Sequence, residues 1–482
     1  MNSSSITLEI CVIALGMVLM LADFFVAPDR KRYLAYAGIV ALTGLLLVSF
    51  SGDGVCSIFG ASFSGSFVED PMALFFKRLF IGSAILVLFL AAEFSDRFAS
   101  GLNEYYSLVV FALAGMLFAA SANDFVMLFV SIELITITFY VLTSFQKNRL
   151  ASLEAAVKYL ILGALASAFM VFGIALIWGT SGELNFNGLA QVSGQLVNNK
   201  LFLAGSLFVL VGLGFKIAAF PFQVWAPDVY QGAPTPTTAF LAIGSKAAGF
   251  VLLLRVLFVA IPAVTQHWVH LLMALSAITI LYGNLCAMPQ RNLKRMLGYS
   301  SIAHAGYLLL GVAALNSSGQ AAVMYYLAGY LFTVTAAFFV IALVLRHVPD
   351  ENVSGLAGLN HRSPLLATTM TISMVSLAGI PPLAGFFGKF LLLKSIIEQG
   401  PAHHGYYFLA FIALIGVIIS ISYYFNVIRA IYWSRDPADL SPITVSGPAR
   451  LSIAICVAGI FWLGLFPESV LNFAMSAAAA IK

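Results

Sequence analysis

The chain is a succession of long apolar runs, and this feature constrains its fold more than any other. A helix of about 20 apolar residues crosses a bilayer, and the 482 residues hold about fourteen such runs. The runs are continuous, whereas the strands of a transmembrane barrel alternate apolar and polar side chains. Only 9% of the residues are charged, against roughly 25% in soluble domains. The sequence therefore predicts an all-α polytopic membrane protein and excludes a soluble enzyme.

Polar connections and helix breakers divide the apolar sequence into its expected spans. The first run follows no positively charged segment and is too long for the apolar core of a signal peptide, so it is expected to stay as a helix. The expected spans are 6–26, 33–50, 71–92, 106–121, 123–145, 153–179, 200–224, 236–262, 267–288, 293–315, 320–345, 364–398, 405–433 and 449–478.

Basic residues gather at alternate connections between these spans. The opposite connections hold little beyond Lys200 and Lys482. Because cytoplasmic loops carry the excess of Lys and Arg, the basic side is expected to be cytoplasmic and both termini to lie on the outer side. The basic side carries Arg30, Lys31, Arg32, Arg97, Lys147, Arg149, Arg291, Lys294, Arg295, Arg346, Arg362, Arg429, Arg435 and Arg450.

Several charged residues lie inside the apolar runs. Arg255 and Lys394 are close enough to helix ends to extend their side chains to the interface, and Lys77 and Arg78 are shallow on the outer side. A second group has no easy route to water, and each unpaired member costs about 3 kcal/mol. These residues must be paired or hydrated. They are Glu133, Lys158, Lys216, Lys246 and Lys389, of which only Lys158 is away from the middle of its span.

Two spans carry polar stripes at helical spacing. Glu133, Thr136, Tyr140 and Ser144 share one helix face, and Ser300, His304 and Tyr307 share another. Histidine has the unperturbed pKa nearest neutrality. His304 is therefore a candidate proton relay, and a hydrogen-bonded structural histidine is the alternative.

Prolines interrupt two spans close to deep lysines. Pro221 follows Lys216 by five residues, and Pro381 and Pro382 precede Lys389. Proline removes a backbone donor and clashes with the preceding turn, so each helix is expected to break there. The carbonyl end of the first half-helix is expected beside the Lys216 ammonium, which it would stabilise. An ordinary proline kink is the alternative.

The two broken helices occupy corresponding places in the chain. Each is the fourth of five consecutive spans, and an odd number of spans makes the second set enter the membrane in the opposite sense. The sequence thus predicts two inverted five-helix repeats, each with a proline-broken helix. The expected divisions are an N-terminal three-helix segment at 1–105, the repeats at 106–262 and 263–433, and a C-terminal helix at 434–482.

The deep charges favour proton transfer over other chemistry. Cys11, Cys56, Cys286 and Cys456 are too far apart for a CxxC metal site, and the sequence has no haem-attachment motif or nucleotide-binding loop. Sodium sites use carboxylates and carbonyls, but Glu133 is the only deep carboxylate among lysines. Neither a cofactor nor a metal is expected in this chain.

Three segments resemble a known family. They are 220–236 (FPFQVWAPDVYQGAPTP), 291–304 (RNLKRMLGYSSIAH) and 379–389 (GIPPLAGFFGK). They look like the subunit N family, the antiporter-like membrane subunits of bacterial proton-translocating NADH–quinone oxidoreductase (complex I). The resemblance covers essentially the whole chain. It implies a multi-pass subunit of the bacterial inner membrane, with FMN and iron–sulfur clusters on partner subunits. It also implies contacts with other antiporter-like subunits, small membrane subunits and lipids.

The resemblance also implies roles for individual residues. Glu133 and Lys216 would form the charged pair of the first half, with Lys158 beside them or extended toward the interface. Lys246 and His304 would form a central polar axis, and Lys389 would be the terminal lysine of the second half. A turn or capping role is expected for Asp228, which follows the broken helix.

Two other functions stay open. A subunit of a multisubunit cation/proton antiporter would share the inverted repeats, although the shortage of oxygen ligands counts against sodium. A purely structural membrane spacer would tolerate neutralisation of all the deep charges. The cost of burying those charges argues against the spacer.

Overall fold

The computed structural model describes residues 6–27, 30–50, 65–98, 101–348, 351–433 and 441–480. The chain divides into two compact units. Unit 1 comprises Met1–Ala218, Gly244–His270 and Ser476–Lys482, and unit 2 comprises Ala219–Ile243 and Leu271–Met475. The boundaries predicted for the repeats stay a prediction.

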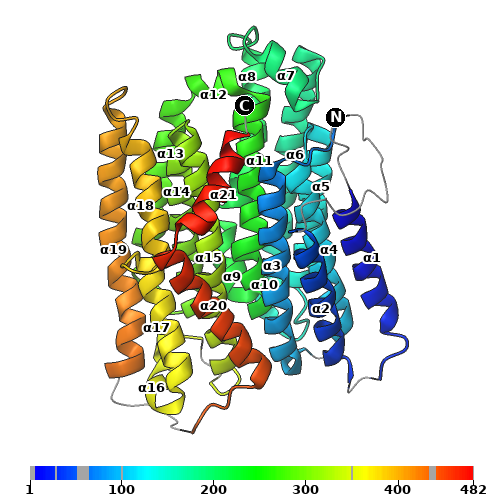
Figure 1. The fold of residues 1–482 in the computed structure, drawn as a ribbon, viewed down its shortest axis with the longest axis vertical. Helices are drawn as coiled ribbons and strands as arrows, with labels where there is room; N and C mark the ends of the chain where they lie inside the picture. Colours follow the sequence, from blue (N-terminus) through cyan, green and yellow to red (C-terminus); the bar gives the residue numbers. More distant parts are fainter. Residues whose placement is uncertain are drawn as a thin grey trace. The chain divides into compact units, whose positions relative to one another are not determined.

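Unit 1 is an assembly of helices in which α1, α2, α3 and α4 lie side by side (Figure 1). The helices of unit 1 are α1 (Thr7–Ala22), α2 (Arg32–Val48), α3 (Pro71–Glu93), η2 (Ser95–Arg97), α4 (Leu102–Ser121), α5 (Phe125–Thr143), α6 (Leu150–Ser181), α7 (Phe186–Ser193), α8 (Lys200–Ile217), α11 (Lys246–Leu254), η4 (Arg255–Ala260) and α12 (Pro262–His267). The short helix α7 was not expected from the sequence.

Unit 2 is also helical, and α14, α15 and α18 pack together within it. Three helices contain a boundary between the units, namely the π-helical segment η3 (Leu241–Ser245), α13 (Val269–Ala287) and α21 (Glu468–Ala479). Unit 2 contains α9 (Trp225–Gly232), α10 (Thr235–Phe240), α13 (Val269–Ala287), α14 (Leu293–Ala313), α15 (Ser317–Val344), η5 (Val353–Leu356), α16 (Leu359–Arg362), α17 (Pro364–Ala378), α18 (Ala384–Ile397), α19 (Gly405–Trp433) and α20 (Gly447–Leu465).

The polytopic all-α fold is confirmed. Within the described ranges, 11 helices are long and apolar enough to cross a membrane, and no extended strand is formed. The shorter helices α1, α2 and α17 are also apolar. The two runs of five spans each contain an interrupted fourth helix, first at α8 and then between α17 and α18.

The last expected span differs from the prediction. The segment 449–478 forms two helices, because α20 ends at Leu465 and α21 begins at Glu468. Pro467 lies between them; it cannot donate a backbone hydrogen bond, and it disfavours helical geometry at Phe466. Phe466 has φ −126° and ψ 60°. The same proline chemistry that breaks the two fourth helices therefore acts here as well.

Short polar side chains fix the starts of several helices. Asp70 Oδ1 accepts a hydrogen bond from the Ala73 N–H at the start of α3, at 2.7 Å. Asp124 caps α5 in the same way at 2.6 Å, through the N–H of Met127. Such caps satisfy donors that a helix cannot satisfy internally, so these polar connections set where the spans begin.

The helices α6 and α8 approach each other closely. A Cβ atom added to Gly173 would lie 2.6 Å from the carbonyl oxygen of Gly205, and one added to Gly205 would lie 2.8 Å from that of Gly173. Small residues let membrane helices pack backbone to backbone. This contact holds α8, which carries Lys216, against α6.

Candidate functional site

The first helix break lies directly after Lys216. Helix α8 ends at Ile217, Ala218 adopts a left-handed conformation with φ +58°, and Pro221 follows before α9 begins. Lys216 is in the last turn of α8 with only 3% of its surface exposed. The expected break beside a buried lysine is confirmed.

Lys216 binds the polar stripe of α5. Its Nζ donates a hydrogen bond to Thr136 Oγ1 at 2.8 Å. Glu133, one turn earlier on α5, accepts a hydrogen bond at Oε1 from Ser167 Oγ of α6 at 2.5 Å. The described contacts therefore place both charged groups on one stripe, each with a hydroxyl partner, and do not join them in a direct ion pair.

Lys246 lies on the helix that packs against α8. It is the first residue of α11 and is 3% exposed. A Cβ atom added to Gly249 would lie 3.2 Å from Cγ of Lys216, so α11 and α8 touch at the level of that lysine. The structure thus brings Lys216 and Lys246 onto facing helices of unit 1.

Lys158 lies on the exposed face of α6 and not beside Lys216. Its side chain is 44% exposed, and its Nζ lies 2.8 Å from Oε1 of Glu154 on the same helix. This i, i+4 pair sits on α6, whose apolar window is only 28% buried. Lys158 was expected to be paired or hydrated, and it is paired with Glu154 on the outward face of α6.

The second helix break surrounds Lys389. Helix α17 ends at Ala378, Gly379 has φ +84°, and α18 begins after Pro381 and Pro382. Lys389 Nζ donates to the carbonyl oxygens of Leu377 at 2.8 Å and Ala378 at 3.1 Å. The partly negative carbonyl end of a half-helix therefore holds a lysine ammonium. The carbonyl contacts are made by Lys389, which is 4% exposed; Lys216 lies in the last turn of its own half-helix.

His304 is the centre of a polar cluster in unit 2. It is 2% exposed, its Nδ1 is hydrogen-bonded to the Tyr326 hydroxyl, and its Nε2 lies 3.0 Å from the Tyr424 hydroxyl. Ser300 Oγ and Tyr424 Oη are 2.5 Å apart. A histidine between two hydroxyls can pass a proton by exchanging donor and acceptor roles.

Tyr307 connects this cluster with the second broken helix. The Lys389 ammonium lies 4.9 Å from the centroid of the Tyr307 ring, at a distance typical of a cation–π contact. Tyr307 is on the same helix as His304, three residues later. The predicted stripe on α14 therefore faces the buried lysine of α18.

Sequence reasoning missed the tyrosines that complete the cluster. Tyr326 and Tyr330 are four residues apart on α15, with rings stacked at 6.3 Å, and the Tyr330 ring lies 5.1 Å from His304. Two tyrosines four residues apart in an apolar helix lie on one face, and this spacing could have indicated a polar cluster. Tyr424 on α19 had no comparable local signal, because its partners His304 and Ser300 are far away in sequence.

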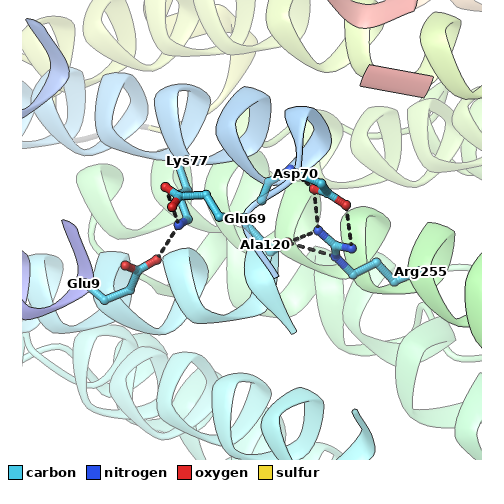
Figure 2. Close-up of polar contacts among 7 residues, drawn as sticks. Glu9, Glu69, Asp70, Lys77, Ala120 and Arg255 are labelled. Carbon is cyan, nitrogen blue, oxygen red and sulfur yellow. Dashed lines mark hydrogen bonds and ion pairs between the residues drawn. The ribbon is translucent and has the colours of Figure 1, made fainter. Parts of the chain in front are cut away.

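Lys77 and Arg255, which were expected near the membrane surface, are enclosed in unit 1. Lys77 is 0% exposed and pairs with Glu9 at 2.9 Å, and Arg255 is 2% exposed and pairs with Asp70 (Figure 2). The prediction that Arg255 extends to the interface was wrong, because Asp70, distant in sequence, neutralises it inside the protein. The shallow position expected for Lys77 stays a prediction. Arg78 is half-buried and donates to the Ser49 carbonyl at 2.5 Å.

The start of α14 carries a further charged cluster. Lys294, expected at a connection on the basic side, is 1% exposed, lies 3.2 Å from Glu351 and donates to the Ala233 carbonyl at 3.1 Å. Arg295 Nη1 lies 2.5 Å from Asp228 Oδ1. This ion pair connects α9 to α14, so Asp228 has a structural role in the contact between the two helices.

The described part of the chain contains no group of three or more His, Cys, Asp or Glu side chains that could hold a metal ion. Lysine, glutamate, histidine and hydroxyl groups make up the contacts described above.

Known proteins match this chain along nearly its full length. The family described as NADH:quinone oxidoreductase/Mrp antiporter, TM, matches residues 122–420. NADH-quinone oxidoreductase subunit N of Moorella thermoacetica is 39% identical over 477 residues, covering 99% of this chain and 98% of that relative.

Solved structures match at the level of the fold as well. A chain of respiratory complex I from Thermus thermophilus with bound aureothin has 32% identity and a TM-score of 0.79, covering 97% of this chain and 99% of that one. A chain of the Mrp complex from Dietzia has 22% identity and a TM-score of 0.77, covering 98% and 97%, and shares the fold. Identity near 40% over the whole length, together with the matching family segment, shows that this chain belongs to the subunit N family of NADH-quinone oxidoreductases.

Proposed function

We propose that this chain translocates protons across a membrane as a subunit of a respiratory NADH:quinone oxidoreductase. The observation that carries the proposal is the pair of buried lysines at the two helix breaks, Lys216 and Lys389. Each lysine costs free energy to bury, and each binds polar groups of neighbouring helices. Intramembrane ionisable groups next to broken helices are typical of ion pathways.

Protons pass along these groups in a defined order. Movement of Glu133 relative to Lys216 changes how strongly the ammonium holds its proton. The released proton moves by way of Lys246 and His304 to Lys389, and then to water. Lys158, on the outward face of α6, serves as an accessory proton donor to the first pair. Asp228 and its partner Arg295 serve the fold.

The energy for this transfer comes from other subunits. Moving one charge against 100 mV costs about 2.3 kcal/mol, and the groups described in this chain are acid–base groups. FMN and iron–sulfur clusters on partner subunits carry the electrons from NADH to quinone. The partners in the membrane are other antiporter-like subunits, small membrane subunits and lipids. The complex resides in the bacterial inner membrane, with both termini of this chain on the outer side.

Lysine substitutions in the assembled complex test the function. Lys389→Met and Lys216→Met should reduce NADH-driven proton uptake into inverted vesicles, measured by the quenching of a ΔpH-sensitive dye. Lys394→Met on α18 and Lys200→Met on α8 are matched controls, because both lysines are exposed. Unchanged proton uptake in fully assembled Lys216→Met and Lys389→Met complexes would refute the proposal.

The same preparation tests the antiporter alternative, which is favoured by the fold shared with the Mrp chain. An antiporter subunit would copurify without flavin and iron–sulfur subunits and would exchange cations for protons in liposomes. NADH oxidation by the purified complex, with no cation-dependent exchange, is the expected result.

A further inference from the structure

Two adjoining hollows lie on the surface of unit 2, near the C-terminal end of α19. The larger has a volume of about 640 Å³ and the smaller a volume of about 340 Å³, and Asn426 of α19 lines both. The described residues that line the larger hollow all belong to α19 and include Phe425, Arg429 and Trp433. The smaller hollow lies between α19 and the connections that precede α14 and η5.

Each hollow contains one arginine. Arg429 lines the larger hollow and Arg291 the smaller one, and both side chains are exposed. No described residue that lines either hollow is acidic. Glu351, in the connection before η5, lies 3.2 Å from Lys294 and accepts a hydrogen bond from Asn292 Nδ2 at 3.2 Å. The two hollows together therefore favour a ligand that carries negative charge.

Backbone contacts fix the wall that carries Arg291. The Val353 N–H donates to the Arg291 carbonyl at 2.9 Å, and Asn292 forms an antiparallel β-bridge with Asn352. The helix η5 packs against α19, which brings Arg291 and Arg429 to one surface although they are far apart in the sequence. A wall held in this way costs a ligand less ordering entropy than a mobile loop would.

An apolar stripe on α19 leads to Arg429. Leu414, Ile418 and Phe425 are exposed, and their spacing puts them on the same helix face as Arg429. Trp433, also exposed, follows one turn later, as aromatic residues do at a membrane interface. The rise from Ile418 to Arg429 is about 16 Å, close to half of the roughly 30 Å hydrocarbon core. An acyl chain along this stripe would therefore keep its phosphate at the level of Arg429.

We propose that the two hollows bind the phosphodiester headgroup of an anionic phospholipid, with its acyl chains on the α19 stripe. Arg429 and Arg291 hold the phosphate oxygens, and the Asn426 amide adds a hydrogen-bond donor where the hollows meet. Basic pockets beside transmembrane helices are typical sites for such headgroups. A soluble anion would leave the apolar stripe unused, so the site fits an amphiphile. The inference assigns a place and a charge to one lipid contact, and it does not depend on the proton path.

The test asks what occupies the hollows in the assembled complex. The photoreactive p-benzoylphenylalanine replaces Phe425, and the purified complex is reconstituted into phosphatidylcholine vesicles that contain tritiated phosphatidylglycerol or, separately, tritiated phosphatidylethanolamine. After illumination, the label bound to this chain is counted on a denaturing gel. The same experiment is made with Arg291→Gln/Arg429→Gln. Lys147→Gln/Arg450→Gln is the matched control, because it also removes two exposed basic residues, and neither lines a hollow.

Phosphatidylglycerol should label this chain at least about five-fold more than phosphatidylethanolamine does. The preference should vanish in Arg291→Gln/Arg429→Gln and persist in the control. Each arginine is also substituted alone, so that poor assembly of the double variant leaves the test intact. None of these readouts depends on proton translocation.

Four results would overturn the inference. They are equal labelling by the two lipids, a cross-link to a neighbouring subunit in place of lipid, a preference that survives the arginine substitutions, and a preference that the control pair also loses. Inorganic phosphate is added in exchange for chloride at constant ionic strength to separate the two sources of a phosphate group. If the phosphate abolishes the preference, the arginines bind a soluble anion and the lipid assignment is wrong.

Discussion

Single hydroxyl groups hold the charged residues of the first helix break. Thr136 Oγ1 accepts a hydrogen bond from Lys216 Nζ and donates one to a carbonyl of its own α5. Thr138 on the same helix makes the second kind of bond, to the Leu134 carbonyl at 2.6 Å, without contacting the lysine. Both threonines are nearly buried, at 3% and 6% exposure. The two side chains therefore differ in whether they contact the lysine, and they form a matched pair for mutation.

Thr136→Val should destabilise the complex by about 2 kcal/mol, because a buried charged donor loses its acceptor. Thr138→Val should change stability much less, since it removes only a bond within one helix. Thermal unfolding followed by the loss of solubilised complex measures the difference. Equal shifts for the two variants would contradict the role of Thr136 as the Lys216 partner.

The sequence was informative about residues whose chemistry is local. Lys216 and Lys389 could be predicted because each lies a few residues from a proline in an apolar run. The burial of Lys77 and Arg255 could not be predicted, because it depends on Glu9 and Asp70, which the fold brings from elsewhere in the chain. A counter-charge distant in sequence has no local signature.

At the scale of helices, the two half-helices end in the same left-handed turn with different residues. Ala218 has φ +58° after α8, and Gly379 has φ +84° after α17. Glycine adopts this conformation without strain, whereas other residues pay roughly 1–2 kcal/mol. Only the second break therefore has the residue that suits its geometry.

Ala218→Gly should raise stability by about 1 kcal/mol by relieving the left-handed turn. Gly379→Ala should lower it by about the same amount or more, because the new Cβ would also lie 2.9 Å from Cδ of Lys389. Unfolding temperatures of the two purified complexes give the sign of each effect. A loss of stability with Ala218→Gly would show that the turn is not strained.

The contact between α6 and α8 provides a second prediction for helices. Gly173→Val should reduce assembly, because its side chain would collide with the Gly205 carbonyl at a cost of roughly 1–3 kcal/mol. Gly179→Val, also on α6, is the control, since a Cβ there has nothing within 4 Å. Yields of assembled complex should fall for the first variant only.

Helix breaks and helix packing differ in how well a sequence reports them. Proline acts on its own turn, so the breaks at Pro221 and Pro381 were predictable, and Pro467 offered the same signal inside the last span. The π-helical segments Leu241–Ser245 and Arg255–Ala260 were not predictable. A change of hydrogen-bond register is decided by packing, and the residues concerned have ordinary helical preferences.

For the whole molecule, the distribution of basic residues predicts the orientation in the membrane. Lys147 precedes α6 and Asn187 follows it, and both side chains are exposed. In a variant without reactive native cysteines, Asn187→Cys should react with an impermeant maleimide added to spheroplasts. Lys147→Cys should react only after permeabilisation. The opposite pattern would reverse the proposed orientation.

The number of spans was predictable because hydrophobic length is a property of the sequence alone. The division into two compact units was not, since Ala219–Ile243 groups with unit 2 although it follows α8 directly. Which helices associate depends on side chains distant in sequence, as the contacts of His304 with α15 and α19 illustrate.

The pairing of Glu9 with Lys77 has a consequence for the order of synthesis. Synthesis starts at the N-terminus, so Glu9 of α1 reaches the membrane before the ribosome has made Lys77 of α3. Insertion of Lys77 alone would cost about 3 kcal/mol. Its counter-charge Glu9 is already in the membrane when Lys77 enters it. A shortened gene that starts after α1 would lose this advantage, and its product should insert α3 poorly.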